Sequence, residues 1–208
     1  MKTLYKILPV LALFFAFAAC EENDATRDYG FAKLYIPQAT VTGLDNSYPI
    51  PLGPFGQNSV YTCKYDNGTG ILDIEVGVIR SGYYAEQKGY SVDLKVSDTE
   101  TADKLATYSE AGTPAAELPA AVVTVPSKIT VPAGQSGEAV YVSVDLKALA
   151  LQKTSLWVTD KYKLLVLGLE ISNPTEYELA DNNTSVVIVL DLNSEYWDTE
   201  VRTLFPMN

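Results

Sequence analysis

The stretch SKITVPAGQSGEAVYVSVDL, residues Ser127–Leu146, decides the fold class. Apolar side chains occupy alternate positions on both sides of the segment PAGQSG, which carries the proline and glycines of a turn. A repeat of two residues places one face of a strand on a core and the other face toward water. We therefore expect a β-hairpin here, and a protein built of antiparallel β-strands.

Further runs of alternating or apolar residues lie on both sides of that stretch, at spacings typical of a two-sheet sandwich. The expected strands are Phe31–Ile36, Val60–Tyr65, Ile71–Ile79, Ser91–Val96, Val122–Val125, Tyr162–Ile171 and Ser185–Leu192. The pair Asn67-Gly68 favours a hairpin between the second and third of them. Tyr162–Ile171 is apolar on both faces, which places it centrally in a sheet. The predicted fold class is all-β, an immunoglobulin-like antiparallel β-sandwich of about seven or eight strands.

Helices are expected to be few and short. Thr101–Ser109 and Lys147–Leu151 are each predicted to form a short helical turn, and no helix is expected to exceed two turns. The segment Ala111–Ala121 is rich in Ala and Pro and is predicted to be a loop.

The composition narrows the classes of function. The chain has 208 residues, 47% of them hydrophobic, which is enough for a folded core. Its formal net charge is −11 and it has no histidine. Nucleic acid is not an expected partner, because phosphate binding needs clustered Lys and Arg. The lack of histidine removes the commonest general base and transition-metal ligand, and we expect neither a cofactor nor a metal.

The N-terminus carries the pattern of a secretory signal with a lipoprotein cleavage site. Two lysines precede the apolar run Leu8–Phe17, and Ala18-Ala19 then leads to Cys20. The apolar run is shorter than the roughly 20 residues that a membrane-spanning helix needs. We expect residues 1–19 to be a removed signal peptide and Cys20 to be lipidated. The alternative is an ordinary cleaved signal that leaves Cys20 as a free thiol.

Residues 20–29 are predicted to be a flexible tether, and residues 30–208 a single β-sandwich domain with a C-terminal tail. Within the tether, the acidic run Glu21–Asp24 resembles the surface-export signal of Bacteroidetes lipoproteins. The plainer interpretation is a solvated linker. The expected location is the outer membrane, lipid-anchored, at the cell surface.

Three segments resemble one protein family: Leu118–Leu149, Lys33–Gln38 and Tyr162–Leu167. They are similar to the hairpin, the opening strand and the late strand of a Bacteroidetes surface lipoprotein domain, the domain of unknown function 1735. The similarity runs from about Lys33 to Leu192. The resemblance implies the fold, the surface location and the role of an N-terminal module in glycan-utilisation lipoproteins. Its motifs are turn and core residues and imply no active site.

Acidic side chains are candidates for a catalytic carboxylate pair or for calcium ligands. Asp73, Glu75 and Asp191 lie on expected strands, on faces predicted to meet solvent. With 26 acidic residues in the chain, chance pairs are expected. Asp181–Asn183 and Asp45-Asn46 offer oxygen ligands for calcium, but such residues in turns more often bond the backbone. We therefore expect no enzyme activity and no metal site.

Aromatic side chains beside predicted loops are the better candidates for a ligand site. A Tyr or Trp ring can stack on the apolar face of a sugar, while polar neighbours bind its hydroxyl groups. The candidate ligand-binding residues form three groups, Tyr83, Tyr84 and Tyr90, then Trp157 and Tyr162, then Tyr196 and Trp197. Trp157 is the first choice because its flanking residues are polar. Aromatic residues at loop edges also cap sandwich cores, and that interpretation stays open.

The leading functional hypothesis is a surface-anchored, non-catalytic lipoprotein that binds glycans or serves as an accessory component in a polysaccharide-acquisition system. Its expected partners are the membrane, through the lipid anchor at Cys20, and an oligosaccharide or outer-membrane transporter proteins. The alternative is a structural or adhesive β-sandwich module that binds a protein partner. A third hypothesis, an unrecognised hydrolase, requires turnover that a carboxylate substitution abolishes.

Overall fold

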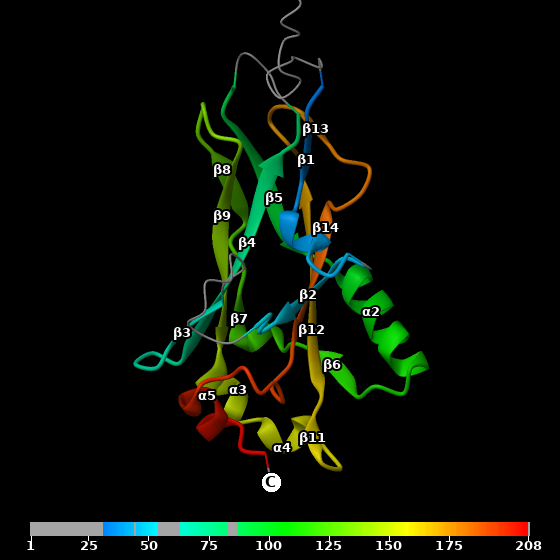
Figure 1. Cartoon of the computed structure of the whole chain (residues 1–208), viewed down its shortest axis with the longest axis vertical. Coiled ribbons are helices and arrows are strands. Elements are labelled where there is room, and N and C mark those ends of the chain that lie inside the picture. The colour runs from blue at the N-terminus through cyan, green and yellow to red at the C-terminus, as the bar shows by residue number, and fades with distance from the viewer. Residues whose placement is uncertain (1–30, 44, 54–62, 83–86, 208) are drawn as a thin grey trace, which may run out of the picture. The chain divides into compact units, whose positions relative to one another are not determined.

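The structure, a computed structural model, describes residues 31–43, 45–53, 63–82 and 87–207. The chain divides into two units, Met1–Phe31 with Gly82–Ala85 and Ala32–Ser81 with Glu86–Asn208. All described strands and helices belong to the second unit (Figure 1). No described helix combines the length and the apolar character needed to cross a membrane.

Two β-sheets of the second unit share one hydrophobic core. The first sheet has the order β13-β1-β4-β9-β7, with β3 also paired to β4. Its strands are β1 (Lys33–Tyr35), β3 (Cys63–Asp66), β4 (Ile71–Arg80), β7 (Val123–Thr124), β9 (Gly137–Asp145) and β13 (Glu178–Leu179). The second sheet has the order β2-β14-β12-β5-β8, with β6 also paired to β12. Its strands are β2 (Ser47–Ile50), β5 (Tyr90–Val96), β6 (Ala115–Glu117), β8 (Lys128–Val131), β12 (Leu164–Ser172) and β14 (Ser185–Leu190).

The predicted all-β sandwich is confirmed. Among the described strands, those of four or more residues are β2, β3, β4, β5, β8, β9, β12 and β14. Most described strand pairs are antiparallel, as predicted. The pairs β1–β13, β2–β14 and β6–β12 are parallel.

The core explains the alternation in the sequence. Leu72 and Ile74 of β4 lie opposite Val144 and Val142 of β9, and all four side chains are fully buried. Burying side chains of this size stabilises the fold by about 1.5–3 kcal/mol each. β12 is apolar on both faces because the core covers one face and a helix covers the other. Its central place in the second sheet is confirmed.

The predicted hairpin within Ser127–Leu146 is wrong. β8 pairs with β5 in the second sheet, whereas β9 pairs with β4 and β7 in the first. The segment PAGQSG therefore carries the chain from one sheet to the other. Both arrangements point alternate side chains into the core, so alternation cannot tell a hairpin from such a crossing. β8 in the second sheet and β9 in the first each turn their apolar face toward the core between the sheets.

The hairpin predicted at Asn67-Gly68 is confirmed, since β3 and β4 pair antiparallel from Asp66 opposite Ile71. The positive φ of this turn, +82°, falls on Gly70. A Cβ at Gly70 would lie 2.5 Å from Cδ of Lys147. The Lys147 ammonium closes the turn by donating to the carbonyls of Asn67 and Gly68, each at 3.0 Å.

The described helices are mostly short, with one exception. They are α2 (Asp98–Glu110), α3 (Leu146–Ala150), α4 (Lys153–Leu156), α5 (Thr199–Leu204) and the 3-10 turns η3 (Pro37–Thr40) and η4 (Ala120–Val122). The expectation of no helix beyond two turns is wrong, because α2 has 13 residues. The expected loop Ala111–Ala121 contains β6 and the start of η4.

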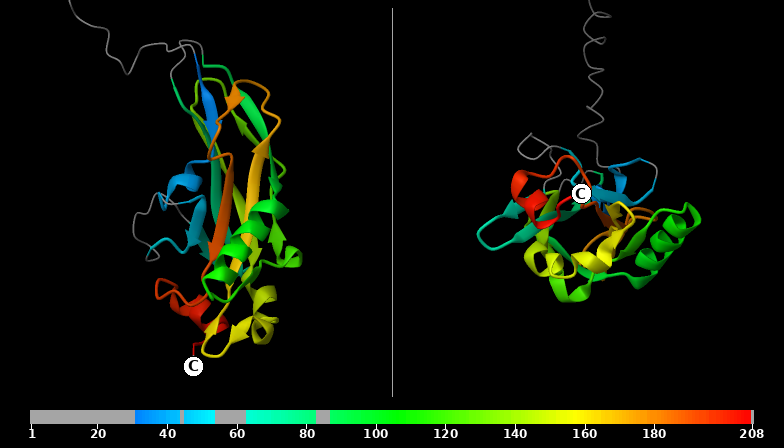
Figure 2. Two further views of the ribbon diagram at one scale, coloured as in Figure 1. Left: turned by 90° about the vertical axis from the view of Figure 1, so that its right-hand side faces the viewer. Right: turned by 90° about the horizontal axis from the view of Figure 1, so that it is seen from below.

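Helix α2 covers the outer face of the second sheet, as Figure 2 shows. Its Leu105 and Tyr108 pack against Val166, Val187 and Val189 of β12 and β14. This second apolar layer accounts for strands that are buried on both sides. The remaining strands, β10 (Trp157–Val158) and β11 (Lys161–Tyr162), form a separate two-stranded ribbon.

Candidate functional site

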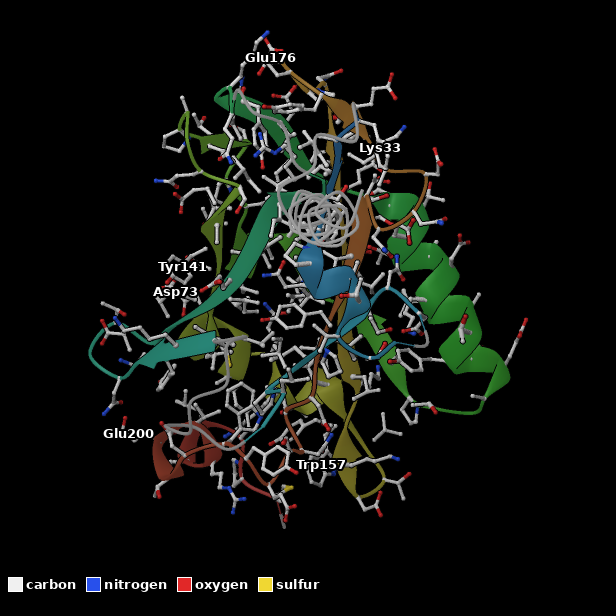
Figure 3. All side chains as sticks on the ribbon, turned by 45° about the horizontal axis from the view of Figure 1, so that its top comes forward. Lys33, Asp73, Tyr141, Trp157, Glu176 and Glu200 are labelled. Carbon is white, nitrogen blue, oxygen red and sulfur yellow. The ribbon has the colours of Figure 1, made fainter. Side chains whose placement is uncertain are left out.

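The ribbon β10–β11 brings the first-choice aromatic pair together at one end of the second unit, beside α3, α4 and α5 (Figures 1 and 3). Trp157 lies directly opposite Tyr162, so both side chains project from the same face of the ribbon. Their ring centroids are 4.6 Å apart at 80°, an edge-to-face arrangement. The turn of the ribbon is closed by the Asp160 amide, which donates to the Val158 carbonyl at 2.7 Å.

Tyr162 is fixed from several sides. The Asn193 side chain accepts from the Tyr162 amide at 2.7 Å and donates to the Tyr162 carbonyl at 2.9 Å. The Tyr162 hydroxyl donates to the Pro206 carbonyl at 3.2 Å, and the ring meets Phe205 edge to face at 5.6 Å. Only 4% of Tyr162 is exposed, and this burial raises the pKa of its hydroxyl. These contacts fix the Tyr162 ring, and Trp157 packs against it.

The two rings line a hollow of about 230 Å³, which we call the Trp157 hollow. It is lined by Lys153, Thr154, Trp157, Tyr162 and Pro206. Trp157 itself is half-buried. Pockets for drug-sized ligands start near 300 Å³, so this hollow suits one ring or one substituent of a longer molecule. Aromatic rings beside a hydroxyl and an ammonium group form a surface that suits a sugar ring.

Sequence reasoning found the two aromatic residues of the Trp157 hollow and missed the others. Lys153 and Thr154 precede Trp157 by four and three residues, the spacing that places side chains on one face of a helix. That signal required a helical turn at Lys153–Leu156, which was not predicted. Asn193 lies 31 residues after Tyr162, and no local pattern points to their contact.

Tyr196 and Trp197 have different surroundings. Trp197 is buried, and its indole N–H donates to the Asp191 carbonyl at 2.7 Å. Tyr196 is 40% exposed. Neither residue lines the Trp157 hollow. Trp197 therefore anchors the segment after β14, and Tyr196 is a surface aromatic residue of the same segment.

The group around Tyr90 is described only in part. Tyr83 and Tyr84 lie outside the described residues, as does Cys20. Tyr90 is 3% exposed, its hydroxyl donates to the Ser136 carbonyl at 2.8 Å, and its ring meets Tyr177 edge to face at 5.5 Å. Burial raises the pKa of Tyr90 to about 12. The structure places this ring within the core.

The acidic residues considered for catalysis are separated by the fold. Asp73 and Glu75 lie on β4 in the first sheet, whereas Asp191 directly follows β14 of the second. Asp73 accepts from the Ser143 hydroxyl at 2.6 Å. Asp191 accepts from the amide and the side chain of Asn193, each at 2.9 Å. Asp191 therefore shapes a turn that also positions Asn193.

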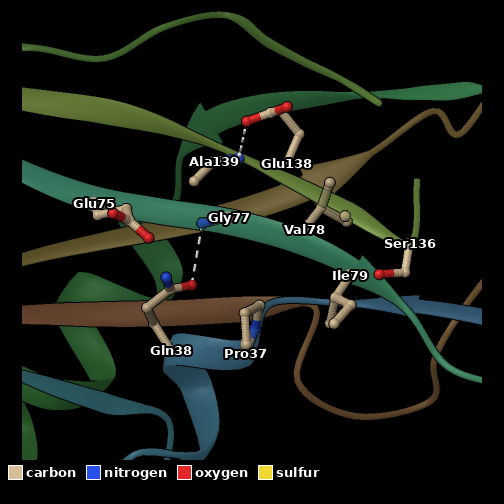
Figure 4. Close-up of a pocket in the computed structure, with 10 residues that line it drawn as sticks. Pro37, Gln38, Glu75, Gly77, Val78, Ile79, Ser136, Glu138 and Ala139 are labelled. Atoms are coloured by element: carbon tan, nitrogen blue, oxygen red, sulfur yellow. Dashed lines mark hydrogen bonds between the residues drawn. The ribbon is translucent and has the colours of Figure 1, made fainter. Parts of the chain in front are cut away.

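A second hollow, of about 350 Å³, lies over β4 and the start of β9 (Figure 4). Gln38, almost fully buried, lines it and accepts from the Gly77 amide at 3.1 Å. The side chains of Glu75 and Glu138 border the hollow. No aromatic ring lines it, so it lacks a stacking surface for a sugar.

A third hollow, of about 440 Å³, brings together the two segments considered for calcium, because Asp45, Asn46, Asn182 and Asn183 line it. The oxygens of Asp45 are already engaged, one by Lys104 at 2.5 Å and the other by the Ser47 amide at 3.0 Å. Burial raises the pKa of Asp45, but these bonds outweigh it and lower the pKa to about 2. Across the described parts of the chain, no three His, Cys, Asp or Glu side chains group to hold a metal ion.

Several solved structures from Bacteroides ovatus are similar to the chain. One, described as a candidate carbohydrate-binding protein, is 10% identical with a TM-score of 0.47, and the match covers 76% of this chain and 36% of that one. Two of unknown function are 16% and 13% identical, with TM-scores of 0.48 and 0.49. Each match covers 77% of this chain, and 46% and 52% of those chains respectively. The chain thus spans about half or less of the length of these proteins.

No curated protein matches the sequence. The sequence model of a family described as "-like, N-terminal domain" matches residues 44–178. This description does not carry the number 1735, so that assignment stays a prediction. The match includes Ser127–Leu146, Trp157 and Tyr162, and it spans more than half of the chain. The chain therefore belongs to this family of N-terminal domains.

Proposed function

We propose that the chain is a surface-anchored, non-catalytic lipoprotein that binds a glycan in the Trp157 hollow, as a component of a polysaccharide-acquisition system. The observation that carries the proposal is the edge-to-face pair of Trp157 and Tyr162 at 4.6 Å in a hollow that also holds Thr154 and Lys153. A sugar ring would place its apolar face on the indole and its hydroxyl groups toward the two polar side chains.

The rigidity of the site supports binding rather than packing alone. Tyr162 is held by Asn193, Pro206 and Phe205 before any ligand arrives. When the side chains of a site are already ordered, binding does not have to immobilise them. This avoids a cost of about 0.5–1.5 kcal/mol for each mobile side chain. A half-buried Trp157 against the Tyr162 ring keeps part of its surface available for contact.

The membrane anchor is a separate part of the proposal. Cys20, after an apolar run and two alanines, is the proposed acylation site, and Glu21–Asp24 is the proposed surface-export segment. Mass spectrometry of the protein from its native membrane tests the anchor. A diacylglyceryl adduct on an N-terminal Cys20 peptide supports it, and an unmodified thiol there contradicts it.

Retention on a panel of immobilised neutral and acidic polysaccharides tests glycan binding. Trp157→Ala is expected to weaken retention by at least about tenfold, the equivalent of about 1.4 kcal/mol. Tyr196→Ala is the matched control, because it removes an exposed ring outside the hollow. Retention that Trp157→Ala leaves unchanged in a folded protein, or no retention on any polysaccharide, would count against the proposal.

The second candidate function is an adhesive module that binds a protein partner, such as an outer-membrane transporter protein. Leu151, between α3 and α4, favours it, because this large apolar side chain is 88% exposed. Contiguous exposed apolar surface marks protein contact, and Leu151 is the most exposed large apolar side chain among the described residues, so it is the position to test. Co-purification of a partner that Leu151→Ser releases, with glycan retention absent, would select this function over glycan binding.

A further inference from the structure

The lysines of the protein divide into engaged and unengaged groups. Five described lysines form ion pairs at 2.5–3.7 Å, namely Lys33, Lys88, Lys95, Lys104 and Lys128. Lys147 donates to two backbone carbonyls. The other described lysines, which form no ion pair with a described carboxylate, are Lys64, Lys153, Lys161 and Lys163. Three of these four fall within the eleven residues that contain Trp157 and Tyr162.

The three lysines differ in their relation to the Trp157 hollow. Lys153 begins α4 and lines the hollow directly. Lys161 lies opposite Val158, so it projects from the other face of the ribbon. Lys161 and Lys163 are the sequence neighbours of Tyr162, and neither side chain lines the hollow. Their charges can therefore act on the hollow only through the field, whose reach at physiological salt is about 8 Å.

The charge of this segment is opposite to that of the protein. Residues 153–163 carry three lysines and one acid, Asp160, which gives a formal charge of 3 − 1 = +2. The whole chain carries −11, so the remainder carries −11 − 2 = −13. The segment that contains Trp157 and Tyr162 is therefore cationic in formal charge within an acidic chain. Local charge of one sign raises the concentration and the association rate of the oppositely charged ligand.

We infer that the Trp157 hollow takes an anionic glycan, a polysaccharide whose sugars carry carboxylate or sulfate groups. This inference rests on the proposed function and adds the ligand class. Trp157 stacks on the sugar ring, and the Lys153 ammonium donates a charge-assisted hydrogen bond to the anionic substituent. Lys161 and Lys163 steer the anionic chain toward the hollow without touching it. An ammonium is a point charge, so it serves a carboxylate or a sulfate equally.

An anionic bilayer also attracts lysines and aromatic rings. The shape of the site favours the glycan. Tyr162 is buried and Trp157 half-buried behind a hollow, whereas insertion into a bilayer needs apolar side chains that protrude. Leu151, two residues before Lys153 in the sequence, is exposed, but one leucine contributes only about 1.5–3 kcal/mol when buried.

The test uses probes that differ in charge and share a backbone. Polygalacturonate and its fully methyl-esterified form share a backbone and differ in carboxylate charge, and dextran sulfate and dextran share a backbone and differ in sulfate charge. Phosphatidylglycerol vesicles represent the bilayer. Binding to each probe is measured by titration of Trp fluorescence and by affinity electrophoresis, from low to physiological salt, with the protein after signal removal.

The variants separate the roles of the side chains. Lys153→Gln is expected to weaken binding to a charged probe about tenfold, because one charge-assisted bond is lost. Lys161→Gln with Lys163→Gln is expected to weaken it about threefold and to flatten its salt dependence. Lys64→Gln is the matched control, because Lys64 lies on β3, forms no ion pair with a described carboxylate and does not line the hollow, and its loss changes the net charge equally. Near-unchanged thermal unfolding confirms that each variant is folded.

Each outcome decides the inference. Stronger binding to a charged probe than to its neutral counterpart, weakened by Lys153→Gln and not by Lys64→Gln, supports it. Equal binding to charged and neutral forms, abolished by Trp157→Ala, overturns the inference and leaves the proposed function standing. No binding to any polysaccharide overturns both. Binding to vesicles alone overturns the inference in favour of a membrane surface.

Discussion

Asn193→Ala tests whether the site is built by the fold as described. The Asn193 side chain makes three hydrogen bonds, to the Tyr162 amide at 2.7 Å, the Tyr162 carbonyl at 2.9 Å and the Asp191 carboxylate at 2.9 Å. Alanine removes all three and leaves two backbone groups of a buried residue without these partners. Tyr162 then loses the contact that fixes its position between Trp157 and Phe205.

The magnitude follows from those bonds. A lost hydrogen bond costs about 0.5–1.5 kcal/mol, and a buried group left unsatisfied costs about 1–3 kcal/mol. With two groups of Tyr162 affected, the free energy of unfolding should fall by about 2–6 kcal/mol. For a protein of this size 1 kcal/mol corresponds to about 2–4 °C, so Tm should fall by on the order of 10 °C.

Urea unfolding, followed by Trp fluorescence, measures the change in unfolding free energy, and calorimetry measures Tm. The control is Asn67→Ala, which removes an exposed asparagine side chain from the β3–β4 turn. Glycan retention should weaken in Asn193→Ala even under conditions where the variant is fully folded, because the wall of the Trp157 hollow is loosened. An unfolding free energy equal to that of the parent protein would refute the reasoning.

Two further predictions concern the packing of α2 and the charge of Asp45. A Cβ at Gly168 would lie 2.6 Å from the Ser97 carbonyl oxygen and 2.8 Å from the Thr101 amide nitrogen. Gly168→Ala should therefore lower the unfolding free energy by about 1–3 kcal/mol. An unchanged urea midpoint would show that α2 does not pack this closely against β12. The pKa of Asp45 lies near 2, below its ordinary 3.8, because bonds from Lys104 and Ser47 outweigh burial. Its stabilisation is therefore complete above pH 3.8 and is lost as the pH falls toward 2, and Asp45→Asn should make the urea midpoint less dependent on pH in that window. Identical pH profiles for the two proteins would contradict this.

The all-β sandwich was predicted mainly from the alternation of apolar residues and from the residues typical of turns. The buried faces of β4 and β9 could be read from single residues, because each position reports its own burial. Which strands pair with each other could not be predicted from single residues. Whether β8 joins β9 or β5 depends on residues distant in sequence, and the connection PAGQSG suits either course.

Helix α2 was underestimated for a related reason. Its outer face is polar, and only Thr101 among its residues is fully buried, so the helical repeat of apolar residues is weak. What holds it is the outer face of the second sheet, where Leu105 and Tyr108 meet three valines. The apolar character of β12 and β14 on both faces was visible in the sequence, but it did not reveal that a helix supplies the cover.

The candidate site, too, was predictable only in part. The aromatic pair was predictable because Trp157 lies in a largely polar stretch, Thr154–Asp160, and Tyr162 follows it by only five residues. The supports of the pair come from Asn193, Phe205 and Pro206, which the fold alone brings near. Exposure was not predictable either, since Tyr90, Tyr196 and Trp197 differ in burial although all lie beside predicted loops.

The passage of the chain from β8 to β9 between sheets has a consequence for how the molecule assembles. Consecutive strands repeatedly belong to opposite layers, and β3–β4 is the only hairpin between consecutive described strands of the two large sheets. Apart from β3–β4 and β12–β14, most described pairings join strands that are distant in sequence. Refolding should therefore be slow for a chain of this length, because long loops must close before these pairings form.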